Sequence, residues 1–252
     1  MLKIKRFLKY EKCIKCKKEF LTVDVRKVNE KESICYECSC EDGYSTRNSM
    51  RIGKPTQMSF SFEFETDSRN NEIYELTKYG FIGCYDGSIS GSEWKSPIFN
   101  NKKSFHAICR KLDKFRTYVG RSCGTHLHVG TEYKNKIRKY QFDIFEPILE
   151  EMRNNEKQTK KFWGRFFNHY CMGRIEVHER YNAFNTLYSV ETLEFRLLKF
   201  INSKQYIRAA DFCIDTTRYI NHHIKKENFN EEDAKKIGKT ILKKYKEVTQ
   251  SV

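Results

Sequence analysis

Three short segments of the chain each carry two side chains that can bind a metal ion or a phosphate, separated by one apolar residue. They are Glu63-Phe64-Glu65, His126-Leu127-His128 and Glu194-Phe195-Arg196. Because successive side chains of a strand point to opposite faces, each polar pair is predicted to share one face, with its members about 7 Å apart. The residue between them would then face a core. Three such strands in one sheet would build a surface that binds metal ions and phosphate.

A fourth segment, Glu93-Trp94-Lys95, repeats this arrangement, so the pattern is less easily explained by chance. Each segment also has a simpler explanation: a solvated strand face for the glutamates, hydrogen-bonded surface histidines, or a salt bridge between Glu194 and Arg196. In the functional interpretation, carboxylates and imidazoles hold divalent cations, and imidazole binds Zn²⁺, Mn²⁺ or Fe²⁺ more readily than Mg²⁺. Arg196 would bind phosphate through two parallel hydrogen bonds.

The composition indicates a folded protein with an excess of positive charge. Of 252 residues, 38% are hydrophobic and 14% aromatic, which supports a packed core despite 32% charged residues. The net charge of +15 favours a polyanion as partner, although the lysines are spread along the chain and equally suit a solvated surface. The chain has no apolar run of the roughly 20 residues that a membrane span needs, and its basic start lacks the apolar stretch of a signal peptide. We therefore expect a cytoplasmic protein without a membrane partner.

Half of the ten cysteines lie within residues 13–40, and four of these form two Cys-x-x-Cys pairs. The pairs are Cys13 with Cys16 and Cys35 with Cys38, and Cys40 is a spare that could replace Cys38. Two such pairs match the tetrahedral demand of structural zinc, and residues 20–28 between them have strand character, as a zinc ribbon requires. The alternative is a set of unrelated buried thiols. We predict a zinc-ribbon-like module at residues 1–45 and, after a polar link, a second domain at 56–252.

The second domain is predicted to alternate strands and helices. Strands are expected at 57–65, within 81–97, and at 125–129, 173–178 and 192–198. Helices are expected at 71–79, 102–118, 203–224 and 230–248. Two more helices are expected within 137–170, with Pro147 at a start or kink. The strands alternate polar and apolar residues, which favours an antiparallel sheet with one open face and helices behind it. We therefore predict an α+β fold whose functional site lies on the open face.

Several nucleotide-binding and catalytic motifs are missing from the sequence. It has no P-loop, no dinucleotide-binding Gly-x-Gly-x-x-Gly, no serine nucleophile elbow and no His-Glu-x-x-His. Phosphate binding would therefore depend on cations and arginines. Asp86 is a further candidate ligand, but its position before Gly87 favours a turn.

The order of these motifs resembles the amidoligase family, ATP-dependent carboxylate–amine ligases related to glutamine synthetase and glutamate–cysteine ligase. The residues that carry the resemblance are Glu63 and Glu65, Asp86 and Ser88, Glu93 with Ser96-Pro97, Cys123 to Gly130, Arg180-Tyr181 with Asn185, and Thr192 to Arg196. It covers about residues 57–220 and excludes the cysteine-rich head. It implies a glutamine-synthetase-like catalytic core, a curved antiparallel sheet with helices on its convex face.

The resemblance also implies roles for individual residues around ATP and two or three Mg²⁺ or Mn²⁺ ions. The implied metal ligands are Glu63, Glu65, Glu93, His126 and Glu194. His128 would face nucleotide or substrate, and Arg180 and Arg196 would neutralise phosphate. Asn185 would contact the nucleotide, although Asn182 competes for that place.

The implied reaction joins a carboxylate to an amine through an acyl phosphate, and its chemistry agrees with the residues present. Phosphoryl transfer needs charge neutralisation and positioning more than a protein nucleophile. Asp86 or a metal-site glutamate could accept the proton of the amine. The substrates could be small molecules, peptides or protein side chains. The alternatives are a zinc-ribbon nucleic-acid-binding protein with an inactive ligase-like body, and a metal-dependent hydrolase.

Overall fold

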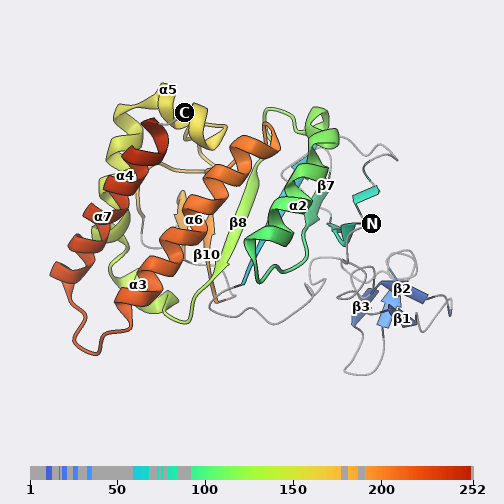
Figure 1. The fold of residues 1–252 in the computed structure, drawn as a ribbon, viewed down its shortest axis with the longest axis horizontal. Helices are drawn as coiled ribbons and strands as arrows, with labels where there is room; N and C mark the ends of the chain where they lie inside the picture. Colours follow the sequence, from blue (N-terminus) through green and yellow to red (C-terminus); the bar gives the residue numbers. More distant parts are fainter. Residues whose placement is uncertain are drawn as a thin grey trace. The chain divides into compact units, whose positions relative to one another are not determined.

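The computed structural model describes most of the second half of the chain and shorter stretches of the first half (Figure 1). The described residues are 10–12, 17, 19–21, 25–27, 33–35, 59–67, 73, 75–76, 79–84, 92–176, 181–186 and 191–250. The chain forms two compact units, the first of Met1–Lys54, Glu63–Ile98 and Tyr118–Cys123, the second of Pro55–Phe62, Phe99–Thr117 and Gly124–Val252. The predicted boundary between 1–45 and 56–252 stays a prediction, because residues 36–58 lie outside the described part.

Six strands form one sheet in the order β6-β7-β5-β8-β10-β9. Their bounds are β5 (Phe60–Thr66), β6 (Ile82–Cys84), β7 (Ser92–Lys95), β8 (Thr125–Gly130), β9 (Phe184–Asn185) and β10 (Thr192–Phe195). The β5–β7, β6–β7, β8–β10 and β9–β10 pairings are antiparallel. The sheet confirms the α+β class and the strands predicted around the three Glu, His and Glu/Arg pairs.

Two small two-stranded sheets lie in the cysteine-rich head. They pair β1 (Tyr10–Lys12) with β2 (Glu19–Leu21) and β3 (Val25–Lys27) with β4 (Ser33–Cys35), both antiparallel. Strands β2 and β3 agree with the strand character predicted for residues 20–28. The side chains of all four predicted zinc ligands, Cys13, Cys16, Cys35 and Cys38, lie outside the described residues, so the zinc site stays a prediction.

Six α-helices and the 3-10 helix η4 have described bounds, and residues 73, 75, 76 and 79 also have 3-10 conformation. The helices with described bounds are α2 (Lys102–Leu112), the 3-10 helix η4 (Asp113–Tyr118), α3 (Lys134–Lys139), α4 (Gln141–Asn154), α5 (Glu156–Trp163), α6 (Ser203–Ile224) and α7 (Glu231–Gln250). Asn101 and Asn202 begin α2 and α6, because each side-chain oxygen accepts a backbone amide of the first turn at 2.9 Å. Within the second unit, α6 lies against β8, α2 lies beside α6, and α4 packs along α7 (Figure 1).

An aromatic core lies on the apolar side of the strands. Phe62 of β5 meets Phe105 of α2 edge to face, with ring centroids 5.7 Å apart, a favourable arrangement for aromatic pairs. Phe64, Leu127 and Phe195 are fully buried. These are the residues that separate the paired polar side chains, so the prediction that they face a core is confirmed.

The region from 137 to 170 contains three helices, not the predicted two, and residues 164–170 are not helical. The break between α4 and α5 falls at Asn155, whose side-chain amide donates to Glu151 O at 3.1 Å. Such side-chain bonds compete with the helical backbone pattern and favour helix ends. Pro147 lies inside α4 and begins no helix.

The strand predicted at 173–178 is wrong for its described residues, 173–176. The Asn182 side chain occupies the backbone groups that a strand ladder would have used. Its Oδ1 accepts from Glu176 N at 3.1 Å, and its Nδ2 donates to Glu176 O at 2.7 Å. The Glu176 backbone is therefore bonded to a side chain and not to a neighbouring strand, although the segment has a period-two pattern.

Gly164 ends α5 in the left-handed region, with φ of 87°, and a Cβ there would press against the carbonyl oxygen of Lys199. Gly164→Ala should therefore destabilise the chain by about 2 kcal/mol or more, because both the backbone and the contact are strained. The expected result is a Tm lower by at least about 4 °C in a thermal melt. Lys161→Ala, an exposed change in the same helix, is the control, and equal melting of the two variants would contradict the prediction.

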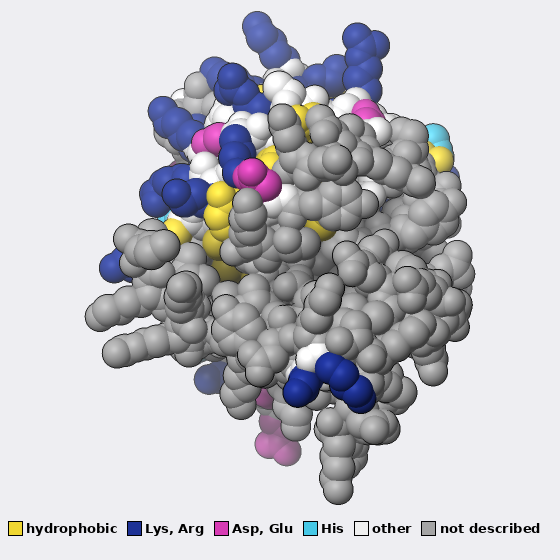
Figure 2. All heavy atoms as spheres, turned by 90° about the vertical axis from the view of Figure 1, so that its right-hand side faces the viewer, with side chains coloured by type: hydrophobic (Ala, Val, Ile, Leu, Met, Phe, Trp, Pro, Cys, Tyr) yellow, Lys and Arg dark blue, Asp and Glu magenta, His cyan; other side chains and the backbone are white. Residues whose placement is uncertain are grey.

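Basic side chains are conspicuous on the surface. On the face that Figure 2 shows, the described Lys and Arg side chains gather mainly over the upper part, with Asp and Glu between only some of them. This distribution agrees with the net charge of +15. Among the described residues, no helix is both long enough and apolar enough to cross a membrane.

Candidate metal centre

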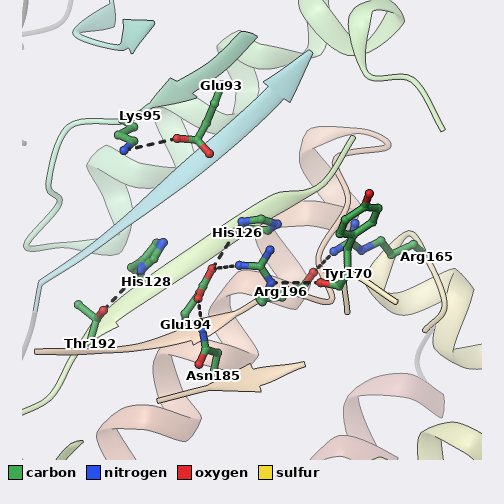
Figure 3. Close-up of polar contacts among 10 residues, drawn as sticks. All are labelled: Glu93, Lys95, His126, His128, Arg165, Tyr170, Asn185, Thr192, Glu194 and Arg196. Carbon is green, nitrogen blue, oxygen red and sulfur yellow. Dashed lines mark hydrogen bonds and ion pairs between the residues drawn. The ribbon is translucent and has the colours of Figure 1, made fainter. Parts of the chain in front are cut away.

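A row of directly opposed side chains runs across strands β8, β10 and β9 (Figure 3). The register places His128 opposite Glu194, and Glu194 opposite Asn185. Directly opposed residues lie on one face, with Cβ atoms about 5 Å apart. The two-residue period puts His126 and Arg196 on that same face. The predicted sharing of one face by each pair is therefore found in both strands.

Glu194 is fully buried and is held by three neighbouring side chains. Asn185 Nδ2 donates to its Oε2 at 2.6 Å, and Arg196 Nη1 donates to its Oε1 at 2.6 Å. His126 Nδ1 lies 3.5 Å from Oε1. A carboxylate is strongly disfavoured in a buried place unless it is paired and hydrogen-bonded. The simpler explanation, a salt bridge with Arg196, thus describes a real contact, but this salt bridge is buried.

Within the second unit, two buried residues of this row offer ligand atoms to a metal ion, His128 and Glu194, which lie directly opposite each other on β8 and β10. The metal role of Glu63, which lies in the first unit, stays a prediction. His128 Nδ1 lies 3.4 Å from Thr192 Oγ1. Metal-binding histidines commonly hold such a partner with one nitrogen and the metal with the other.

The donor set of this group suits a divalent cation of intermediate softness. A carboxylate oxygen and an imidazole nitrogen fit Mn²⁺, Fe²⁺ or Zn²⁺, whereas Mg²⁺ prefers oxygen alone. His128 and Glu194 are both 0% exposed. A carboxylate in so dry a place is costly, so a cation beside it would lower its free energy.

The polar face of the sheet is not open to solvent, contrary to the prediction. Glu65 is 5% and His126 is 6% exposed, and Glu63 is equally buried. A solvated strand face is therefore the wrong explanation for the two glutamates, and surface histidines are the wrong explanation for the His pair. The physical reason is visible at Glu194, where charged groups pair with one another and so tolerate burial.

In the first unit, strands β5 and β7 carry a second group of charged side chains on one face. The register places Glu63 opposite Lys95 and Glu65 opposite Glu93. Lys95 Nζ lies 3.4 Å from Glu93 Oε1 (Figure 3). Like charges directly opposite each other destabilise a sheet, so Lys95 beside Glu93 lessens the repulsion between Glu93 and Glu65. The expected shared faces are again found, and the metal roles of Glu65 and Glu93 stay predictions.

Arg196 is held in one orientation by three groups. Besides its bond to Glu194, its Nε donates to the carbonyl oxygen of Tyr170 at 3.2 Å, and its guanidinium lies 5.5 Å from the ring centroid of Tyr181. Its side chain is 12% exposed. A planar guanidinium with several fixed donors is well suited to bind a phosphate bidentately.

Arg165 is a candidate functional residue that the sequence analysis missed. Its Nη2 donates to the carbonyl oxygen of Arg196, and its buried Nε has no hydrogen-bond partner. A Cβ on Gly124 would lie 2.9 Å from Arg165 Nη1 and 3.0 Å from His126 Nε2, so both side chains reach the same spot. Arg165 follows a helix end and belongs to no periodic pattern. Only the glycine before the His strand hinted at a close approach.

The predicted site residues fall into two groups in the structure. Asn185 lies in the row with Glu194, whereas the Asn182 amide is bonded to the Glu176 backbone. His128, for which a nucleotide or substrate role was predicted, lies directly opposite Glu194, and His126 does not. Asp86 and Arg180 lie outside the described residues, so their catalytic roles stay predictions.

Cys123 precedes the His strand but is not a nucleophile. Its Sγ donates to Asp67 Oδ1 at 3.0 Å, and burial together with this carboxylate raises the pKa of the thiol from 9.0 to about 12. We expect no alkylation of Cys123 by iodoacetamide at pH 8 in the folded chain, and ready alkylation in denaturant, both read by peptide mass spectrometry. Rapid labelling of the folded chain would contradict this.

The raised pKa of Cys123 also sets a direction for stability. Above pH 9 the unfolded thiol loses its proton while the folded thiol keeps it up to about pH 12. The unfolded state is therefore favoured increasingly between these values, and the contribution of this thiol to stability is complete only below pH 9.

Comparison with protein-family models, with curated proteins and with solved structures finds no match to this chain. The resemblance to amidoligases therefore depends on the sequence motifs quoted above.

Proposed function

We propose that the protein is an ATP-dependent ligase that joins a carboxylate to an amine, with a divalent cation held by His128 and Glu194. The observation that carries this proposal is the buried, directly opposed imidazole and carboxylate, whose Glu194 is bonded to a fixed arginine. The order of motifs in the sequence adds the reaction class. The finer fold, a curved glutamine-synthetase-like sheet with helices on its convex face, belongs to the same proposal.

The cation would neutralise phosphate oxygens of the nucleotide, which is the chemistry that phosphoryl transfer needs most. The donor set favours Mn²⁺ over Mg²⁺ at this position. In the proposal His128 takes the ligand role that the resemblance gave to His126. His126, whose Nδ1 lies 3.5 Å from Glu194 Oε1, orients that carboxylate instead. Glu65 and Glu93 would hold a further cation.

The proposed reaction has two steps. The substrate carboxylate attacks the γ-phosphorus of ATP, ADP leaves, and an acyl phosphate forms. The amine then attacks the acyl carbon, inorganic phosphate leaves, and one proton passes from the amine to a carboxylate, for which Asp86 is the candidate. Arg196 and Arg180 would stabilise the charge of the transferred phosphoryl group, together with Arg165, which bonds the Arg196 carbonyl oxygen.

The head would be a separate structural module in this proposal. Cys13, Cys16, Cys35 and Cys38 would bind zinc, and the metal would supply much of the folding free energy of so short a segment. Elemental analysis of the purified chain tests this directly. Cys13→Ser should lower the zinc content, and Lys17→Ala, an exposed change in the same segment, should not.

The proposed function is tested by incubating the full chain with Mn²⁺, ATP and mixtures of candidate acids and amines. ADP and phosphate should be released only when an acid and an amine are both present. Turnover without ATP would replace the ligase with a metal-dependent hydrolase, and salt-sensitive nucleic-acid binding without any ATP effect would favour an inactive ligase-like body.

A matched pair of histidine variants tests the metal site itself. His128→Asn should weaken Mn²⁺ binding at least about 10-fold in a calorimetric titration, because it removes the proposed imidazole ligand. His106→Asn is the control, since His106 lies on α2, with Nε2 3.0 Å from Asp211 Oδ1. Equal Mn²⁺ affinity in the two variants would overturn the site.

A further inference from the structure

A pocket of about 370 Å³ lies where α3 passes into α4, in the second unit and away from the row of metal-competent residues. Its lining residues are Asn135, Arg138, Lys139, Gln141, Phe142 and Ile175. The lining contains two cations and no acidic residue. Asp143 follows Phe142 in the sequence but does not line the pocket.

Phe142 is the most unusual residue of this pocket. Its side chain is 62% exposed, more than any other large hydrophobic side chain among the described residues. Lys139 ends α3 and Phe142 lies in the first turn of α4, and both side chains line the pocket. An exposed aromatic ring beside cations suits a ligand that combines a flat apolar face with negative charge.

A hydrogen bond also connects the pocket to the segment that carries Asn185 of the candidate site. Its Gln141 is buried, and its Oε1 accepts from Thr186 Oγ1 at 3.2 Å. Thr186 directly follows Asn185, the partner of Glu194. The floor of the pocket is therefore fixed by a hydrogen bond rather than by a mobile surface side chain.

We infer that this pocket binds single-stranded nucleic acid, with a base stacked on Phe142 and the adjoining phosphates at Arg138 and Lys139. Stacking supplies binding that tolerates any base, because every base has a flat face. The net charge of +15 adds general attraction for the phosphate backbone. An acidic peptide would match the cations but would leave the exposed ring without a flat partner. The inference does not depend on ligase activity.

The test is fluorescence anisotropy of a labelled oligothymidylate with the full chain, without ATP. Phe142→Ala should weaken binding about 10-fold, because it removes one stacked base. Phe142→Tyr keeps the ring and should bind like the unchanged chain. Ile201→Ala is the control for lost exposed apolar area, since Ile201 is 47% exposed and lies outside the pocket.

The phosphate contacts are tested through the salt dependence of the same binding. Lys139→Gln should lower the slope of log K against log salt by about 0.7, the value for one phosphate contact on a single strand, whereas Lys161→Gln on the exposed side of α5 should leave it unchanged. Equal affinity of Phe142→Ala and Ile201→Ala would overturn the inference. Binding of the oligonucleotide at the head would give this result. Equal competition by polyglutamate would also overturn it, in favour of an acidic peptide.

Discussion

Glu194→Ala should be the most destabilising single change in the candidate site, lowering the free energy of unfolding by about 3 to 5 kcal/mol. The variant leaves a part-buried guanidinium and a buried amide without the carboxylate that pairs with both at 2.6 Å. For a chain of 252 residues this corresponds to a Tm lower by about 6 to 20 °C. A thermal melt followed by circular dichroism measures it.

The same melts test the metal. Mn²⁺ should raise the Tm of the unchanged chain, because a cation that binds only the folded state stabilises it, and should leave the Tm of Glu194→Ala where it was. Glu191→Ala is the matched control. Its side chain is 61% exposed and its carboxylate lies 3.6 Å from Lys134 Nζ, so its loss should cost less than about 1 kcal/mol. If the two alanine variants had the same Tm, the bonds of Glu194 to Asn185 and Arg196 would not stabilise the fold as predicted.

The pairing of side chains on one face could be predicted from the sequence because it depends only on the local period of a strand. Glu194 and Arg196 needed no knowledge of the rest of the fold to be placed together. The same holds for the buried residues between the pairs, such as Leu127 and Phe195, whose apolar character already indicated a core. Helices α6 and α7 could also be predicted from local sequence, because both have long apolar stripes and α6 begins at an asparagine cap.

Non-local features could not be predicted in this way. The position of β9 beside β10 follows from tertiary packing, and it decides that Asn185 lies opposite Glu194. The register of β8 on β10 decides that His128, and not His126, lies opposite Glu194. A one-residue shift would reverse every face, and a two-residue shift would exchange the two histidines, yet neither shift leaves a mark in the local sequence.

Burial of the polar face was the largest surprise, and its cause is also non-local. A run such as Glu194-Phe195-Arg196 looks the same whether its charged side faces water or protein. The difference lies in partners from elsewhere in the chain, Asn185 for the carboxylate and the Tyr170 carbonyl for the guanidinium. Arg165 escaped notice for the same reason, because its contact with the Arg196 carbonyl is a tertiary one.

Arg196→Lys should reduce ligase turnover at least about 100-fold while leaving Mn²⁺ affinity within a few-fold. Lysine keeps the positive charge beside Glu194, so the electrostatic balance around the cation is preserved. It cannot bond Glu194 and the Tyr170 carbonyl at once and still present two parallel donors to a phosphate, as the guanidinium can. The loss should therefore appear in kcat and not in metal binding.

Arg218→Lys on α6 is the matched control, because it makes the same replacement outside the candidate site. Arg218 Nη1 lies 3.8 Å from Asp215 Oδ1. That variant should turn over at the normal rate. A shared loss of turnover would indicate a general effect of arginine replacement on the fold. Full turnover by Arg196→Lys would mean that the fixed guanidinium serves only to neutralise Glu194, and phosphate would then have to be bound elsewhere on this face.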